Sequence, residues 1–181
     1  GADEVIVQPF PSVQLFQKRC EIVVGGKALP LRQMRPNGIV PPVSPPDGIT
    51  GRVIYAGGGT PAEYGDADPA GAIVALDYGA GANWLRAFRL GAAAVVFLAD
   101  GTPGTGEALH TDAAVNLPRF YYEGKAGDLL AGGVATIFSE AEWRPVVSAN
   151  VIGVIRGTAP AFGIGRDEYL VVSAGLDSFG Q

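Results

Sequence analysis

The sequence has few of the side chains that usually carry chemistry. Its 181 residues include one cysteine, Cys20, and one histidine, His110. A single cysteine excludes an internal disulfide and a metal cluster built from thiolates of this chain. Cys20 stands in the segment KRCEIVV, where a strand is predicted to begin. We therefore interpret it as a buried, inert thiol rather than a reactive one.

Clustered positive charge is also lacking. The 13 lysines and arginines are dispersed, and with 18 acidic residues the formal net charge is −5. Binding to polyphosphates depends on clustered cations that release counterions, so we expect no nucleic-acid partner.

Long apolar runs are missing as well. The longest strongly apolar run, residues 92–98, is far too short to cross a bilayer, so we expect no membrane span. Residues 1–8 carry Asp3 and Glu4 and do not resemble a signal peptide, which leads us to expect a mature or trimmed chain.

What is present favours a compact core. Hydrophobic residues make up 48% of the chain and charged residues only 17%, a balance typical of a folded domain. The central stretch, residues 71–101, predicts a strand at 73–76, a short helix and a second strand at 93–98. Because residues 93–98 are apolar at every position, we expect a central strand covered on both faces.

The helix between these strands has recognisable ends. Asn83 is predicted to cap its first turn and Gly91 to end it. The spacing places Trp84, Leu85 and Phe88 on one buried face, with Arg86 and Arg89 pointing away.

A similar strand–helix–strand pattern follows, and hairpins precede both. Two such units predict a mixed sheet with small helices packed on it. Gly25-Gly26 tolerates the positive φ of a tight hairpin turn within residues 21–29. The proline-rich segment 30–46 reads as a stiff extended connector, although Pro42-Val43-Ser44-Pro45 also fits a PxxP ligand. The further expected elements are strands at 13–16, 21–24, 51–56, 117–122, 134–138, 150–155 and 168–173, and a helix within 124–130.

Several polar groups suggest sites, and each has a structural alternative. His110 lies near Asp112 without a nucleophile motif and reads as a surface-loop residue. A calcium loop or a solvated turn would explain Glu63, Asp66 and Asp68, and the same choice applies to Asp100, Glu107 and Asp112. The glycine-rich segments 57–59 and 101–106 lack the context of a nucleotide loop and read as turns. Trp143 reads either as an exposed anchor for a partner or as a cover for the edge of the core.

Three successive segments resemble the protease-associated (PA) domain in its usual order: GAIVALDYG, WLRAFRLGAAAVVFLAD and LPRFYYEGKAGDLLAGG. Residues 90–95, LGAAAV, fit the family stretch closely, whereas Ala72 stands where a lysine is usual. The resemblance covers about residues 51–139 and rests on packing motifs. It implies a domain without catalytic residues of its own.

The last residues resemble the opening hairpin of the di-zinc aminopeptidase and carboxypeptidase family, whose members commonly carry a PA domain. Asp177 and Ser178 match the family's A-H-x-D-S motif, but Gly175 occupies the position of the zinc-binding histidine. Glycine has no imidazole, and one carboxylate cannot hold zinc. The resemblance implies that the remaining ligands lie after Gln181, so we expect this chain alone not to be the peptidase.

Together these observations predict an α+β fold, a strand-rich open barrel or sandwich with two short flanking helices of the swivelling β/β/α type. We expect residues 1–50 to form strands, a hairpin and the connector, residues 51–145 a PA-like core, and residues 146–181 the truncated start of a zinc peptidase domain. We nominate no catalytic, cofactor-binding or metal-binding residue.

The resemblance implies a non-catalytic module of a secreted or periplasmic zinc exopeptidase. Such a module controls access of substrates or contacts proteins, its partners being peptide or protein substrates or the adjoining peptidase domain. Zinc would belong to the parent protein. The alternatives are a piece of a degenerate, metal-free receptor-like or scaffold relative, and a self-contained small enzyme.

Overall fold

The computed structural model describes residues 2–34, 42–99 and 115–155. The chain divides into two compact units, which we describe separately. The larger unit comprises Gln17–Glu142, and the smaller unit joins Gly1–Phe16 to Trp143–Ser178. The described elements are β1 (Glu4–Val24), β2 (Lys27–Pro30), β3 (Arg32–Gln33), β4 (Ile49–Tyr55), α1 (Pro61–Tyr64), β5 (Ile73–Asp77), the 3-10 helix η1 (Tyr78–Asn83), α2 (Trp84–Arg89), β6 (Ala94–Leu98), β7 (Arg119–Tyr122), α3 (Ala126–Leu130) and β8 (Val134–Val154).

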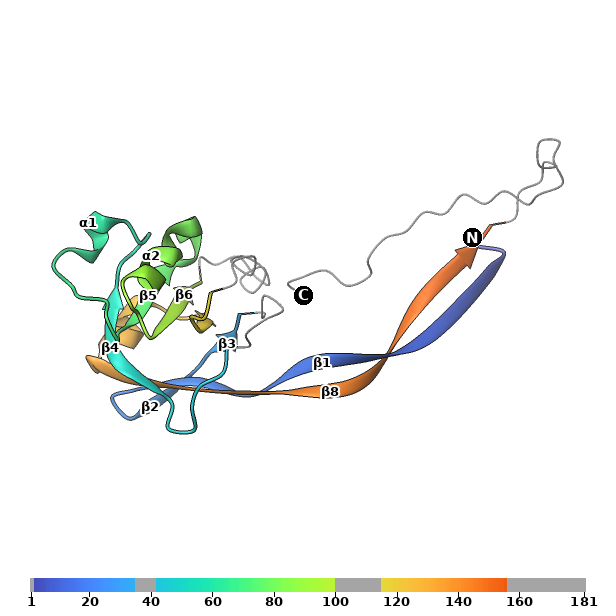
Figure 1. Cartoon of the computed structure of the whole chain (residues 1–181), viewed down its shortest axis with the longest axis horizontal. Coiled ribbons are helices and arrows are strands. Elements are labelled where there is room, and N and C mark those ends of the chain that lie inside the picture. Colours follow the sequence, from blue (N-terminus) through green and yellow to red (C-terminus); the bar gives the residue numbers. More distant parts are fainter. Residues whose placement is uncertain (1, 35–41, 100–114, 156–181) are drawn as a thin grey trace. The chain divides into compact units, whose positions relative to one another are not determined.

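The strands form one mixed sheet in the order β2-β1-β8-β4-β5-β6-β7-β3 (Figure 1). Strands β4, β5, β6 and β7 pair parallel with one another, whereas β2 pairs antiparallel with β1, β8 with β4, and β3 with β7. The predicted α+β class and mixed sheet are confirmed. The swivelling type and the predicted domain boundaries at 50/51 and 145/146 stay predictions.

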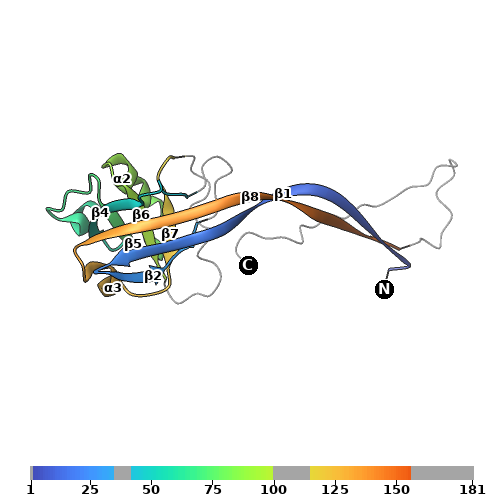
Figure 2. The ribbon, with the colours of Figure 1, turned by 90° about the horizontal axis from the view of Figure 1, so that it is seen from below.

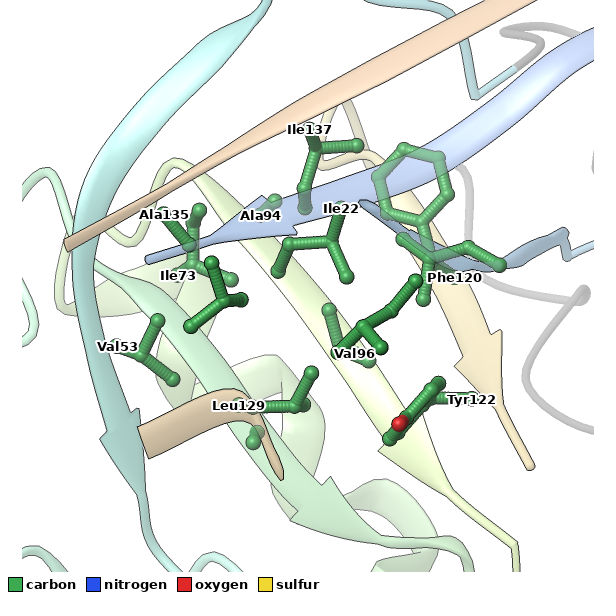
Figure 3. Close-up of a cluster of buried hydrophobic side chains, with 14 of the residues drawn as sticks. Ile22, Val53, Ile73, Ala94, Val96, Phe120, Tyr122, Leu129, Ala135 and Ile137 are labelled. Atoms are coloured by element: carbon green, nitrogen blue, oxygen red, sulfur yellow. The ribbon is translucent and has the colours of Figure 1, made fainter. Parts of the chain in front are cut away.

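Strands β5 and β6 separate two hydrophobic clusters. Ile73 and Val96 belong to the first cluster, to which β1, β4, β7, β8 and α3 also contribute (Figure 3). Val74 and Phe97, next along the same strands, belong to the second cluster, which Trp84 and Ala87 of α2 cover. The prediction of a central strand apolar on both faces is therefore confirmed, because successive side chains of a strand point to opposite sides.

The predicted hairpin at the end of β1 is present. Val24 pairs with Lys27, and the two turn residues have positive φ, 55° at Gly25 and 80° at Gly26. Only glycine adopts this conformation without a steric penalty. The strands predicted at 13–16 and 21–24 are, however, one continuous strand, β1. Those predicted at 134–138 and 150–155 are likewise both part of β8, and residues 168–173 lie outside the described residues.

The helix α2 differs from its prediction in three side chains. Asn83 makes no capping hydrogen bond: it has helical dihedral angles as the last residue of η1, and its side-chain amide donates to the carbonyl oxygen of Gly58 at 2.8 Å. Phe88 is 41% exposed, and the small Ala87 takes the buried position instead. Arg86 does not point away, since its Nε donates to the carbonyl oxygen of Gly59 at 3.1 Å. The predicted stop is confirmed by Gly91, whose φ is 80°.

The end of the proline-rich connector is held against β8. The Ser44 amide donates to the carbonyl oxygen of Ser139 at 2.9 Å, and the Ser139 amide donates to the Ser44 hydroxyl at 3.0 Å. These bonds support the connector interpretation of Pro42-Val43-Ser44-Pro45 over that of a free PxxP ligand.

Candidate functional site

The carboxyl ends of the parallel strands are the first place to look for a site, because ligands of open α/β sheets bind at this edge. The glycine-rich turn, residues 57–59, follows β4 here, and Asp77 ends β5. The Tyr55 hydroxyl donates to the Asp77 carboxylate at 2.7 Å, which raises the pKa of Tyr55. The edge thus carries polar groups, and their partners decide what it can bind.

Glu63 occupies the donors of the glycine-rich turn. Its carboxylate accepts hydrogen bonds from the amides of Gly58 and Thr60, both at 2.9 Å, and from the Thr60 hydroxyl at 2.6 Å. The Thr60 hydroxyl, followed by these two amides, lowers the pKa of the Glu63 carboxyl. The turn therefore binds an anion that belongs to its own chain, in the manner of a capping box.

The loop that carries Glu63, Asp66 and Asp68 is a turn whose carboxylates bond its own backbone. Glu63 is engaged as described, and Asp68 accepts a hydrogen bond from the Ala70 amide at 3.0 Å. Within residues 2–34, 42–99 and 115–155, no three His, Cys, Asp or Glu side chains gather as a metal site would require. These contacts favour the solvated-turn interpretation of Glu63, Asp66 and Asp68.

Cys20 is buried in the first hydrophobic cluster and is a free thiol. Burial raises its pKa to about 12, a hydrogen bond with Ser139 opposes the shift, and the charge of Glu21 adds to it. A thiol with such a pKa is almost entirely protonated at neutral pH and is a poor nucleophile. The prediction of a buried thiol is confirmed, and the raised pKa supports its interpretation as inert.

Tyr64 carries a polar atom that the fold leaves unsatisfied. Its side chain is 7% exposed, and among the described residues its hydroxyl is the one buried side-chain oxygen or nitrogen without a hydrogen-bond partner. Burial raises the pKa of this phenol, and the charge of Arg86 opposes the shift.

Trp143 is exposed, which contradicts the interpretation that it covers the edge of a core. It is 57% accessible in the smaller unit, where β8 lies beside β1 as a two-stranded ribbon (Figure 2). Val147, at 79%, and Val151, at 55%, are exposed on the same strand. The sequence pattern allowed Trp143 as an anchor for a partner, whereas no motif pointed to the two valines.

One pocket of about 260 Å³ lies at the edge of the larger unit, where β3 meets the end of β7. Arg32 and Glu123 line it and form an ion pair at 2.6 Å. Both side chains are more than half exposed, at 53% and 63%, so this pair contributes little to stability. No sequence motif pointed to this pocket, because its lining comes from segments about 90 residues apart.

The remaining candidates lie outside the described residues. They are His110 with Asp112, Asp100, Glu107, the segment 101–106, and the tail residues Gly175, Asp177 and Ser178. None of the helices that the structure describes has the length and apolar character that a membrane crossing needs.

Comparisons with known proteins find likeness at the level of structure. No family model and no curated protein sequence matches the chain. An aminopeptidase from Aneurinibacillus sp. strain AM-1 matches 83% of this chain with 22% identity and a TM-score of 0.52, over 38% of its own length. A zinc aminopeptidase from Bacillus subtilis matches 83% with 21% identity and a TM-score of 0.54, over 36% of its length. A Peptidase M28 precursor from Shewanella amazonensis matches 84% with 16% identity and a TM-score of 0.54, over 41% of its length.

At these identities the likeness establishes the fold. The chain has a strand-rich α+β architecture that also occurs within aminopeptidases, and it spans less than half the length of each of these structures.

Proposed function

We propose that this chain is a non-catalytic, protease-associated module of a zinc-dependent exopeptidase. In this role it borders the active site of an adjoining peptidase domain and shapes the access of peptide substrates, or it contacts other proteins. The observation that carries the proposal is the fold, which matches 83–84% of this chain to 36–41% of three peptidase structures. A match of this kind is expected for one domain of a larger enzyme.

The use of polar groups in the larger unit supports a structural role. The carboxylate of Glu63, the amide of Asn83 and the guanidinium of Arg86 each bind backbone or side-chain groups of the same turn region. Groups that are satisfied in this way stabilise the fold and are not poised to activate a substrate.

The zinc and its ligands would belong to the adjoining peptidase domain. The partners we propose are that domain and its peptide substrates. From the PA resemblance we also propose a secreted or periplasmic location.

Incubation of the purified chain with Zn²⁺ and with aminoacyl and peptidyl reporter substrates tests the non-catalytic role. We expect no turnover above that of Zn²⁺ alone. The proposal implies a longer protein in which a peptidase domain adjoins this chain, and we expect that protein to hydrolyse the same reporters and to lose activity after chelation. Metal-dependent turnover by the 181-residue chain itself would contradict the proposal and favour a self-contained enzyme.

The second candidate is a receptor-like or scaffold relative without metal. Gly175 favours it, because the resemblance places a zinc-binding histidine at that position. Metal analysis of the longer protein distinguishes the two. Bound zinc with hydrolysis supports the exopeptidase, whereas a metal-free, inactive protein supports the receptor-like relative.

A further inference from the structure

One face of β8 in the smaller unit carries no polar side chain. Side chains of a strand alternate between two faces, so every second residue from Trp143 shares one side of the ribbon. The residues on this apolar face are Trp143, Pro145, Val147, Ala149, Val151 and Gly153. The polar side chains of the same stretch, Arg144, Ser148 and Asn150, all fall on the opposite face.

The opposite face of β8 is in contact with side chains of β1. The Arg144 guanidinium lies 5.1 Å from the centre of the Phe16 ring, and the Asn150 amide donates to the Gln8 amide oxygen at 3.4 Å. Arg144 and Asn150 thus have side-chain partners in β1, and the large residues of the apolar face are more than half exposed.

Such a face is unusual in water. Scattered apolar residues are normal on a protein surface, but a contiguous apolar stripe marks an interaction site. A two-stranded ribbon is also marginally stable by itself and gains stability when a face is covered. Because the stripe carries no charge, its partner is an apolar protein surface rather than a nucleic acid or a charged ligand.

The comparisons indicate which partner. Residues 17–142 are about 70% of the chain, yet the structural matches cover 83–84% of it. The shared fold must therefore include part of the smaller unit. In the three matched structures this shared region is 36–41% of a longer chain, so most of each peptidase accompanies it.

We propose that the apolar face of β8, centred on Trp143, Val147 and Val151, packs against an apolar surface of the adjoining peptidase-type domain. This proposal rests on the proposed function. In the docked state the ribbon is a structural part of the interface, and Arg144 and Asn150, on the polar face, keep their side-chain contacts with Phe16 and Gln8 of β1.

Matched lysine substitutions in the longer natural protein test the interface. Val147→Lys and Val151→Lys place a charge on the apolar face, and Ser148→Lys and Asn150→Lys place the same charge one residue away on the polar face. We expect only the first pair to increase amide hydrogen exchange in residues 143–154, by about tenfold, because only that pair opens the covered face. Equal effects of the two pairs would overturn the proposal.

A second measurement uses the tryptophan already present. Acrylamide quenches the fluorescence of exposed tryptophans. The difference in quenching between the wild type and the Trp143→Phe variant reports on residue 143 alone. We expect this quenching to be strong in the 181-residue chain, where Trp143 is 57% exposed, and at least about threefold weaker in the longer protein, as burial of an indole would require. Equal quenching in both proteins would contradict docking. A concentration-dependent loss of quenching in the 181-residue chain would identify a second copy as the occupant and would also overturn the proposal.

Hydrolysis separates this inference from the proposed function. Suppose that the wild-type longer protein shows zinc-dependent activity and that both pairs of variants show equal amide hydrogen exchange. This result would contradict the proposed interface and would still support the proposed function. An inactive, zinc-free longer protein removes the exopeptidase assignment and with it the peptidase-type domain as the occupant.

Discussion

The side-chain amide of Gln33 donates to the hydroxyl of Ser139 at 2.7 Å, joining β3 to β8 across 106 positions of sequence. Gln33 is 8% exposed and Ser139 is fully buried. The same hydroxyl donates to the carbonyl oxygen of Pro42 at the end of the proline-rich connector. One serine therefore satisfies polar groups from two distant segments inside the larger unit.

We expect Ser139→Ala to lower the free energy of unfolding by about 1–3 kcal/mol, because it leaves the buried Gln33 amide and the Pro42 carbonyl with fewer partners. Urea unfolding followed by circular dichroism measures this. Thr50→Ala is the control, since Thr50 also loses a side-chain bond, to Thr136 at 2.8 Å, but at an exposed position. A loss no larger than that of the control would show that the buried network is dispensable.

Cys20 predicts a loss of stability in alkali. Its pKa is raised from 9.0 to about 12 by burial, so the unfolded chain releases the thiol proton first as pH rises. The contribution to stability is complete below pH 9 and is lost between pH 9 and about pH 12. Between pH 9 and about pH 12 the free energy of unfolding should fall less steeply with pH for Cys20→Ala than for the wild type. Because both proteins contain the same tyrosines, the difference between them reports on the thiol. Identical slopes would contradict the raised pKa.

Glu63 predicts the opposite dependence in acid. Its pKa is lowered from 4.5 by the Thr60 hydroxyl and by the Gly58 and Thr60 amides. The stabilisation is therefore present above pH 4.5 and is lost as pH falls through the lower folded value. Glu63→Ala should lower the melting temperature at pH 7 and have little effect at pH 2. Asp66→Ala, at an exposed position of the same loop, serves as the control and should change neither.

Two glycines predict opposite results for the same substitution. A Cβ at Gly51 would lie 2.5 Å from the Gly71 carbonyl oxygen on the way to β5, so Gly51→Ala should destabilise by about 1–3 kcal/mol. A Cβ at Gly127, exposed in α3, would meet nothing within 4 Å. Gly127→Ala should stabilise by about 0.5–1 kcal/mol through its helix preference. Chemical denaturation measures the free energy of unfolding of both variants. If both substitutions changed this free energy in the same direction, the close approach of β4 to the start of β5 would be contradicted.

Tyr64→Phe removes the buried hydroxyl that has no partner. Since deleting an unsatisfied polar group relieves its desolvation cost, we expect stability to stay unchanged or to rise by up to about 1 kcal/mol. Tyr122→Phe is the matched variant, because the Tyr122 hydroxyl donates to Asp128 at 3.1 Å. Loss of that hydrogen bond should lower the stability. Differential scanning calorimetry compares the two, and a clear destabilisation by Tyr64→Phe would reveal a bond that this hydroxyl makes.

The candidate interface was partly readable before the structure. The alternation that places Trp143, Val147 and Val151 on one side of β8 can be predicted from the sequence. The exposure of that side cannot be predicted in this way, because it depends on whether another element covers the strand. The same limit applies to Trp143, for which the sequence allowed both an anchor and a core cover.

The sequence alone determined the elements that depend only on residues close together in the chain. An unbroken apolar run predicts the buried strand β6, and paired glycines predict the hairpin at Gly25-Gly26, since neither depends on a distant partner. Tertiary structure decided the rest. Asn83 is a sound helix cap by residue type, yet its amide binds Gly58, because a short polar side chain bonds whichever backbone group the fold brings near. The bond between Gln33 and Ser139 joins two strands, β3 and β8, that four other strands separate in the sheet order, so only the folded sheet brings them together, and no local periodicity encodes a contact across so many residues.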